Sequence, residues 1–235
     1  MLVAGLVRSS LIDYPGQVAA VVFTQGCNFR CGFCHNPDLI SSQFPVPSSQ
    51  YADKEVIEFL KTRVGKLDGV VITGGEPMVQ PDLIEFIKDI KALGFLVKLD
   101  TNGSNPIMLK QVIDAKLVDY IAMDIKGPLE KYMIICGYSN TKVIQESIDI
   151  IKTSGVTYEF RTTVLPHFHE LTDLRIIGKM IEGAPLYTIQ GFRPQIVLDK
   201  LLERAKSFSK TELVEIRNEI APFVSRVVIH DNLSC

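Results

Sequence analysis

The sequence predicts a parallel α/β fold, in which strands and helices alternate along the chain. From about residue 18 almost to the end, short apolar runs alternate with segments of helical periodicity. Several of these runs are rich in Val and Ile and apolar on both faces, which is typical of parallel strands covered on both sides. Strand and helix alternate about six times, which favours either an open doubly wound sheet or a full or partial barrel.

The expected strands are short apolar runs that follow one another along the chain. They are Val18–Thr24, Val70–Thr73, Phe95–Leu99, Val118–Asp124, Tyr158–Val164 and Leu186–Gln190. The run Val224–Ile229 is a candidate for a last strand.

The helices expected between these strands have recognisable ends. Pro81–Gly94 is expected to form a helix, because Pro suits the first helical position and Gly the C-terminal stop. Thr141 is expected to cap a helix that ends at Gly155. Near the C-terminus, Ser209 followed by Glu212 has the form of a capping box. We interpret the apolar stripes on these helices as core packing.

The whole chain, residues 1–235, is expected to form one domain, since a chain of this length buries a sizeable core. The Pro- and Ser-rich segment Ser41–Ser49 and the loop around Gly127–Asn140 are interpreted as surface or functional loops rather than linkers. We place the motif-bearing core at about residues 9–195 and a C-terminal helix and strand extension at about 196–235.

Composition excludes several classes of protein. The content of 46% hydrophobic residues argues against disorder, and the net charge of −2 indicates no basic surface for nucleic acid or anionic membranes. Apolar runs such as Val18–Phe23 are far shorter than the roughly 18 residues that suggest a membrane span. The first ten residues do not have the pattern of a signal peptide. We therefore expect a cytoplasmic protein that binds neither nucleic acid nor a membrane.

The cysteines indicate a metal or redox centre. Of the five, Cys27, Cys31 and Cys34 fall in one short stretch, whereas Cys136 and Cys235 stand alone. An odd number with one tight cluster argues against a disulfide framework. Cys136 lies in an apolar run and is interpreted as a small buried hydrophobic residue, and Cys235 as a bystander.

Three thiolates at this spacing can hold one centre from a single loop, and thiolates select zinc, Cu(I) or an iron–sulfur cluster. A structural zinc site has four protein ligands. His35 is the nearest candidate for the fourth, but because it is adjacent to Cys34 the two residues could bind the same small ion only with strain. Three ligands therefore indicate a centre with an open position. The segment Cys31–His35 also fits a haem attachment pattern and a thioredoxin-like pair, but neither explains Cys27.

Further polar motifs follow the other expected strands. They are Gly74–Glu76, Asp100–Gly103 and the pair Asp124 and Lys126, which strand alternation places on one side. Arg161 lies late in a later strand. Because the carboxyl ends of parallel strands share one face, we expect these residues to form one site with the cysteines.

Together these residues resemble those of radical S-adenosylmethionine (SAM) proteins, whose hallmark is a C-x3-C-x2-C motif with an aromatic residue, here Phe33, before the last cysteine. The sequence is more closely similar to activating enzymes of glycyl radical enzymes, among them those of anaerobic ribonucleoside-triphosphate reductase and pyruvate formate-lyase. The resemblance covers roughly residues 9–165. It rests on Ser10–Gly16, Phe23–Cys27, Cys34–Pro37, Gly74–Pro77, Asp100–Gly103 and Asp124–Lys126.

The resemblance implies a partial (β/α)6 TIM-like radical SAM barrel with one [4Fe-4S] cluster on Cys27, Cys31 and Cys34, and SAM on the open iron. The residues that the resemblance implies at SAM are Phe33, His35, Gly74, Gly75, Glu76, Asp124 and Lys126. The strand pattern adds Arg161 to this group. Of these, Glu76 and its two glycines would receive the amine, and Phe33 and His35 would lie near the adenine. Asp100, Thr101 and Asp124 match positions that bind a monovalent cation in some relatives.

The resemblance also implies partners. A reduced flavodoxin or ferredoxin would supply the electron that cleaves SAM into methionine and a 5′-deoxyadenosyl radical. The radical would remove hydrogen from the Cα of one glycine in a glycyl radical enzyme. Asp13–Gly16 matches a family stretch near the partner's glycine loop, and the whole opening Ser10–Gly16 favours the ribonucleotide reductase as target.

The chain departs from some relatives in two respects. No cysteine lies between Cys34 and Cys136, which predicts one cluster without an additional ferredoxin-like region. Some relatives bind SAM with a histidine of the last strand, where this chain has Gln190–Arg193 instead. No role is assigned to His167, His169 and His230.

Two other hypotheses remain. A radical SAM enzyme acting on a small molecule, similar to 7-carboxy-7-deazaguanine synthase, would have a closed pocket instead of a groove wide enough for a protein loop. A non-catalytic zinc or cluster module that only docks a partner would explain the cysteines, but not Gly74–Glu76 and Asp124–Lys126 on the same face.

Overall fold

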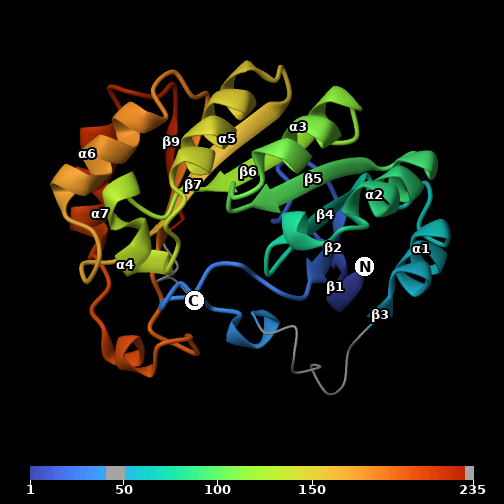
Figure 1. Ribbon diagram of the computed structural model, residues 1–235, viewed down its shortest axis with the longest axis horizontal. Helices are drawn as coiled ribbons and strands as arrows, with labels where there is room; N and C mark the ends of the chain where they lie inside the picture. Colours follow the sequence, from blue (N-terminus) through green and yellow to red (C-terminus); the bar gives the residue numbers. More distant parts are fainter. Residues whose placement is uncertain (41–50, 231–235) are drawn as a thin grey trace.

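The computed structural model describes residues 1–40 and 51–230, which form one curved sheet with helices packed against it (Figure 1). The segment Ser41–Ser49 and Cys235 lie outside the described residues. Among the described residues the sheet has nine strands in the order β3-β1-β2-β4-β5-β6-β7-β8-β9. Their bounds are β1 Leu2–Ser10, β2 Ala19–Thr24, β3 Tyr51–Ala52, β4 Gly69–Gly74, β5 Leu96–Thr101, β6 Tyr120–Asp124, β7 Thr157–Val164, β8 Tyr187–Gly191 and β9 Val227–His230.

Parallel pairing runs without interruption from β2 to β9 across the sheet. Each expected strand is present within a few residues of its expected position, which confirms the parallel α/β prediction. The antiparallel strands β1 and β3 at the β3 edge were not predicted. The second half of β1 is largely exposed and polar, and β3 has two residues, so neither has the apolar pattern of a buried strand.

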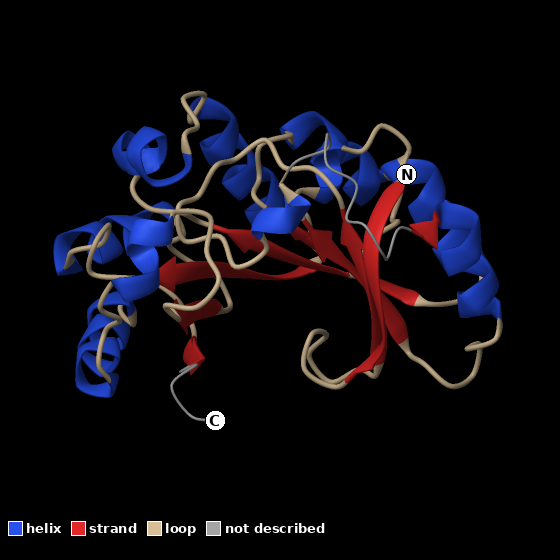
Figure 2. Ribbon diagram, turned by 90° about the horizontal axis from the view of Figure 1, so that it is seen from below, coloured by secondary structure: helices blue, strands red, loops and turns tan. Residues whose placement is uncertain are grey.

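The helices lie on the convex side of the sheet, and the opposite side is concave (Figure 2). They are α1 Asp53–Lys61, α2 Leu83–Ala92, α3 Pro106–Asp114, α4 Tyr132–Cys136, α5 Lys142–Thr153, α6 Leu171–Met180 and α7 Lys210–Ile220. A curved parallel sheet with helices on one side is part of a barrel rather than a doubly wound sheet. Within residues 1–40 and 51–230, no helix is both long and apolar enough to cross a membrane.

The helix ends agree with the sequence in one case and differ in two. Ser209 caps α7, because its hydroxyl accepts the Glu212 N–H and Glu212 bonds back to the Ser209 backbone. Thr141 precedes α5, but its backbone is already helical and its side chain caps nothing, so that prediction was wrong. Helix α2 begins at Leu83, two residues after Pro81, because Asp82 is the N-cap residue.

The core has a large and a small part. The large part lies between the sheet and the helices, where Ile and Val side chains of the strands meet the apolar helix faces. The small part lies on the concave side, where Tyr14 covers Val71 and Ala122 and meets the Tyr120 ring edge-on at 5.9 Å. The segment that joins β1 to β2 is therefore anchored beneath the sheet.

Candidate active site

A cavity of about 220 Å³ opens at the carboxyl ends of β2, β4, β5, β6 and β7. All thirteen residues that the sequence predicts for the site line this cavity. They are Cys27, Cys31, Phe33, Cys34, His35, Gly74, Gly75, Glu76, Asp100, Thr101, Asp124, Lys126 and Arg161. The parallel topology therefore brings the separate motifs to one place, as expected from the common direction of the strands.

The cysteines belong to the loop that follows β2. Hydrogen bonds from Gly26 N–H to Leu39 O and from Cys34 N–H to Cys31 O, at 2.6 and 3.0 Å, shape this loop. Burial is the main cause that raises the pKa of the Cys27 thiol to about 12, and burial also raises the pKa of Cys34. Buried thiols of this kind ionise when they bind a metal, because the metal replaces the proton.

The donor set fits an iron–sulfur cluster. Three thiols face one cavity, and the ammonium of Lys126 lies close enough to favour the charged form of all three. Within the described residues, no group of three His, Cys, Asp or Glu side chains converges tightly enough to hold a single ion. A [4Fe-4S] cluster binds each thiolate through a different iron, so its ligands need not converge on one point.

The two glycines after β4 are required by backbone packing. A Cβ on Gly75 would lie 2.0 Å from Gly26 O, and a Cβ on Gly74 would lie 2.4 Å from Thr24 N. Gly74 also has a φ of +115°, which side chains rarely adopt. Close contact lets the Glu76 N–H bond to Gly26 O at 2.8 Å, and so ties the end of β4 to the cysteine loop.

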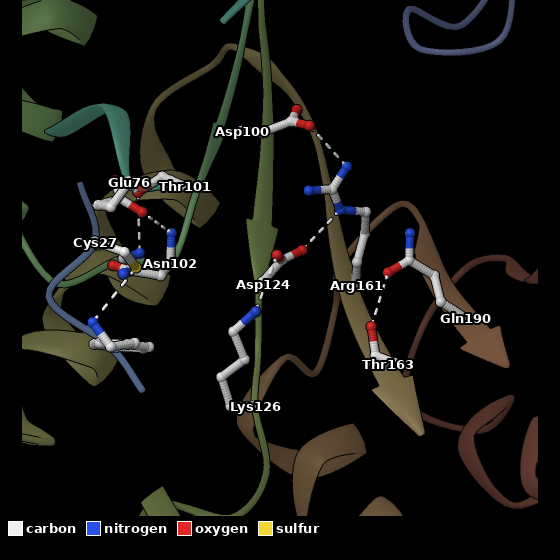
Figure 3. A network of polar contacts seen from close by, with 12 residues as sticks. Cys27, Glu76, Asp100, Thr101, Asn102, Asp124, Lys126, Arg161, Thr163 and Gln190 are labelled. Carbon is white, nitrogen blue, oxygen red and sulfur yellow. Dashed lines mark hydrogen bonds and ion pairs between the residues drawn. The ribbon is translucent and has the colours of Figure 1, made fainter. Parts of the chain in front are cut away.

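The Glu76 carboxylate is buried and held by donors from two strand ends (Figure 3). It accepts hydrogen bonds from Thr101 Oγ1 at 2.7 Å, Asn102 N–H at 2.7 Å and Met78 N–H at 3.1 Å. Burial nevertheless raises its pKa to about 7, the hydrogen bonds acting in the opposite direction. A buried carboxylate with this orientation is a suitable acceptor for a ligand ammonium group.

Charged side chains of β5, β6 and β7 form an alternating row (Figure 3). Lys98 Nζ pairs with Asp100, Arg161 bridges Asp100 and Asp124 at 3.1 and 2.8 Å, and Lys126 Nζ pairs with Asp124 at 3.1 Å. Burial alone would raise the pKa of Asp124, but Arg161 and Lys126 lower it to about 2. The row therefore stays ionised at neutral pH, and its carboxylate oxygens already face cationic groups.

Aromatic side chains form another wall of the cavity. The Phe33 ring lies 6.0 Å from that of Phe168, and the His35 ring stacks on Phe192 at 5.7 Å. The Oε1 of Gln190, in β8, accepts a hydrogen bond from Thr163 Oγ1 at 3.3 Å. Thr163 lines the cavity, whereas Gln190 lines a neighbouring one.

The structure adds residues that sequence reasoning missed. Asn102 belongs to a motif the sequence singled out, yet its N–H bond to Glu76 becomes visible only when β4 and β5 are paired. His169, to which no role was assigned, is buried and lies 2.9 Å from Lys126 O. Since Leu165 N–H donates to its Nδ1, its Nε2 carries the proton and supports the backbone beside Asp124 and Lys126.

Cys136 is buried, in agreement with the sequence, and it does not line the cavity. Its thiol donates a hydrogen bond to Tyr132 O at 3.1 Å, and its carbonyl accepts the Arg30 N–H at 2.8 Å. Nothing in the sequence indicates the contact with Arg30, because the two residues are far apart in the chain.

Comparison with known proteins agrees with this geometry. The family model described as "Radical SAM superfamily" matches residues 21–176. A protein of Methanocaldococcus jannaschii named "Putative glycyl-radical enzyme activating enzyme MJ1227" is 34% identical over 234 residues, covering 97% of this chain and 95% of the relative. The "Pyruvate formate-lyase-activating enzyme" of Listeria monocytogenes is 34% identical over 142 residues, covering 57% of this chain and 56% of the relative.

Solved structures with the same fold have low sequence identity. SuiB of Streptococcus suis bound to SAM has a TM-score of 0.68 at 11% identity, and the match covers 90% of this chain and 49% of the SuiB chain. A domain of the pyruvate-formate lyase-activating enzyme of Bacteroides vulgatus has a TM-score of 0.55 at 14% identity, covering 68% of this chain and 98% of its own. At this identity the likeness shows the fold alone.

Proposed function

The chain belongs to the radical SAM superfamily, and we propose that it activates a glycyl radical enzyme by abstracting hydrogen from a glycine of that partner. The observation that carries the proposal is the convergence of Cys27–Cys34, Gly74–Glu76 and Asp124–Lys126 on one cavity at the strand ends. The family implies a [4Fe-4S] cluster and SAM. Cluster and SAM, when bound, supply the reductive cleavage that yields the 5′-deoxyadenosyl radical.

The chain's own residues hold and orient these groups. Cys27, Cys31 and Cys34 would bind three irons and leave the fourth open to the SAM amine and carboxylate. The buried Glu76 carboxylate would accept an N–H of the SAM amine, while Lys126 provides a cation for the SAM carboxylate. The Asp100–Arg161–Asp124 row would keep Lys126 in place through Asp124.

The aromatic wall would complete the SAM site. Phe33 is buried and the exposed His35 ring stacks on Phe192, so both offer a flat ring surface to an adenine. A monovalent cation at Asp100, Thr101 and Asp124 would have to compete with Lys98 and Arg161 for the carboxylate oxygens. We therefore propose that the SAM site can form without a monovalent cation.

A protein substrate is supported by the concave side of the sheet. A second cavity of about 380 Å³ adjoins the first, since Asp100 and Arg161 line both. Ile12 and Asp13 lie at its edge, and the Ile12 side chain is 88% exposed. The exposed apolar side chain at the edge of this cavity is suited to contact with a protein partner.

The relatives' names support the same class of partner, because they name activating enzymes of glycyl-radical enzymes and of pyruvate formate-lyase. Within that class we propose anaerobic ribonucleoside-triphosphate reductase as the target, because of the Ser10–Gly16 opening. A reduced flavodoxin or ferredoxin is proposed as the electron donor.

The proposal is tested by anaerobic reconstitution with iron and sulfide, followed by dithionite, SAM and the purified reductase. We expect 5′-deoxyadenosine and a glycyl radical signal on the reductase, both absent in Cys27→Ala. If a radical formed on pyruvate formate-lyase but not on the reductase, the proposed target would be wrong and the proposed activity would stand. Product formed from a metabolite in the absence of a partner protein would favour the small-molecule hypothesis. A purified protein that contains zinc but no iron, and that does not bind SAM, would favour the docking-module hypothesis.

A further inference from the structure

Lys126 lies just past the end of β6, and its backbone is held by side chains instead of by a neighbouring strand. Strand β6 ends at Asp124, and the Ile125 N–H still donates to Arg161 O of β7 at 2.8 Å. The backbone N–H and C=O of Lys126 bond instead to one side chain of α4 and one side chain of the loop after β7. Its ammonium lines the first cavity and pairs with Asp124 at 3.1 Å. The position of this ammonium therefore depends on how the two side chains hold the backbone.

His169 holds the carbonyl group of Lys126. The His169 side chain is buried, its Nδ1 lies 3.3 Å from the Leu165 nitrogen, and its Nε2 lies 2.9 Å from Lys126 O. A backbone amide can only donate, so Nδ1 is the acceptor and Nε2 carries the proton that is donated to Lys126 O. The His169 N–H also donates to Leu165 O at 3.0 Å, which closes the turn that carries the ring. His169 thus connects the end of β7 to the end of β6.

Tyr132 of α4 holds the amide group of Lys126. Its side chain is 0% exposed, and its hydroxyl oxygen accepts the Lys126 N–H at 3.2 Å. The Phe29 ring meets the Tyr132 ring edge-on, at 6.2 Å between the centroids. A Cβ on the next residue, Gly127, would lie 2.4 Å from Ile135 Cδ1, so α4 packs directly against the backbone beside Lys126. The amide group therefore has a buried acceptor on a closely packed helix.

We infer that Tyr132 and His169 form a clamp on the Lys126 backbone, and that this clamp positions the Lys126 ammonium for the SAM carboxylate. The inference rests on the proposed function, since it requires SAM as the ligand. A lysine side chain is flexible, so a fixed backbone reduces the conformational freedom that is lost when its ammonium meets a ligand. Neither Tyr132 nor His169 lines the cavity. Both are therefore positioning residues that act through Lys126.

Two amide substitutions at position 169 separate the two hydrogen bonds of the ring. The amide nitrogen of Gln lies as many bonds from Cα as Nε2 does, so His169→Gln can still donate to Lys126 O. The amide oxygen of Asn corresponds to Nδ1, so His169→Asn can accept the Leu165 N–H but does not reach Lys126 O. In equilibrium binding of SAM to the cluster-loaded protein, we expect His169→Gln to stay within about twofold of the wild type and His169→Asn to bind about tenfold more weakly. Equal losses in the two variants, or no loss in His169→Asn, would overturn the inference.

A double-mutant cycle distinguishes the positioning of Lys126 from a general structural effect. Lys126→Met should itself bind SAM more weakly than the wild type does. In the Lys126→Met background, His169→Asn should cause no further loss of affinity, because no ammonium remains to be positioned. An equal loss in both backgrounds would overturn the inference while leaving the proposed function intact. Cluster-loaded wild-type protein that does not bind SAM would contradict the proposed function, and the inference with it.

Tyr132→Phe keeps the inference testable if His169→Asn does not fold, because it removes one hydroxyl group and keeps the buried ring. We expect it to bind SAM about threefold more weakly when Lys126 is present, and to have no effect in the Lys126→Met background. Tyr158→Phe is the matched control, since Tyr158 lies at the amino end of β7 and lines neither cavity. It should leave the affinity unchanged. Tyr132→Phe that binds SAM as tightly as the wild type, or no more weakly than Tyr158→Phe, would overturn the inference.

Discussion

Glu76 shows how much one buried side chain can determine. It is placed among three donors, yet burial keeps its pKa near 7 rather than at its ordinary value. Burial opposes ionisation because the interior cannot solvate the charge, and the hydrogen bonds compensate in part. The N–H group of a ligand amine beside Glu76 would supply further compensation.

The affinity for SAM is therefore expected to depend on pH. Ionised Glu76 is a much stronger acceptor for the SAM amine N–H than the protonated carboxyl group is, so affinity should rise by up to about tenfold between pH 6 and 8 as the group with a pKa of about 7 loses its proton. Equilibrium binding of SAM to the cluster-loaded protein measures this. Glu76→Gln should bind more weakly and with no such rise. A wild-type affinity that is constant across this range would contradict the assignment.

Gly75 is a second residue whose role is local. In Gly75→Ala the new Cβ would overlap Gly26 O, so the cysteine loop must move away from β4. We expect a loss of about 2 kcal/mol in the free energy of unfolding and a lower iron content after reconstitution. Urea unfolding and iron analysis measure the two effects.

Gly5→Ala is the control for this substitution, because its Cβ would meet Phe23 at an ordinary 3.7 Å. It should change iron content little. If Gly75→Ala assembled a full cluster with unchanged SAM binding, close backbone packing would not be what requires glycine at this position.

At the scale of elements, the strands place charges that the motifs alone do not explain. Asp100 pairs in register with Ala122, and Asp124 with Arg161, so the row crosses β5, β6 and β7 on one face. Neither Lys98 nor Arg161 belongs to a recognisable motif, yet together they neutralise Asp100. Parallel register brings the residues together, and burial strengthens their mutual attraction.

Arg161→Met should therefore destabilise the sheet by about 2 kcal/mol at neutral pH, because it leaves two partly buried carboxylates short of a cation. The pKa of Asp124 is depressed in the wild type, so the stabilisation is present above about pH 4 and is lost as the pH falls towards 2. The difference between wild type and variant should shrink in the same range, as measured by urea unfolding.

Arg175→Met is the matched control for that measurement. Arg175 forms an exposed ion pair with Glu219 at 3.3 Å, and its loss should change stability by less than about 0.5 kcal/mol. A pH-independent difference for Arg161→Met would show that lost packing, not charge, accounts for the effect.

On the scale of the whole molecule, the convex side is covered by helices and the concave side is not (Figure 2). The segment between β1 and β2 is anchored there by Tyr14, while Leu11 and Ile12 remain exposed. This segment is thus held in place by Tyr14 while its apolar side chains stay exposed beside the second cavity. Such an arrangement is suited to binding a partner protein.

We expect Ile12→Ser to separate the two halves of the reaction. With dithionite, 5′-deoxyadenosine formation should equal that of the wild type, because Ile12 does not line the SAM cavity. Glycyl radical formation on the partner should fall about tenfold through weaker docking. Ile107→Ser, an exposed residue of α3 on the convex side, is the control and should affect neither. Loss of SAM cleavage in Ile12→Ser would contradict the separation.

The sequence by itself determined where along the chain the parallel strands lie and at which end of them the site is formed. Both follow from local properties: apolar runs predict strands, and parallel strands must end on one side of a sheet. The cysteine spacing, the strand-end positions and the family resemblance were together sufficient to name thirteen of the residues that line the cavity. The edge strands β1 and β3 escaped prediction because they lack a buried pattern.

Only the tertiary structure decided which of these groups touch. The Glu76–Asn102 bond, the bridge by Arg161, the bond of His169 to the Lys126 carbonyl and the bond of Arg30 to the Cys136 carbonyl all join residues that are remote in the chain. Their meeting depends on strand register and on the paths of loops. Local periodicity does not encode these, because they are set by the packing of the whole sheet against its helices.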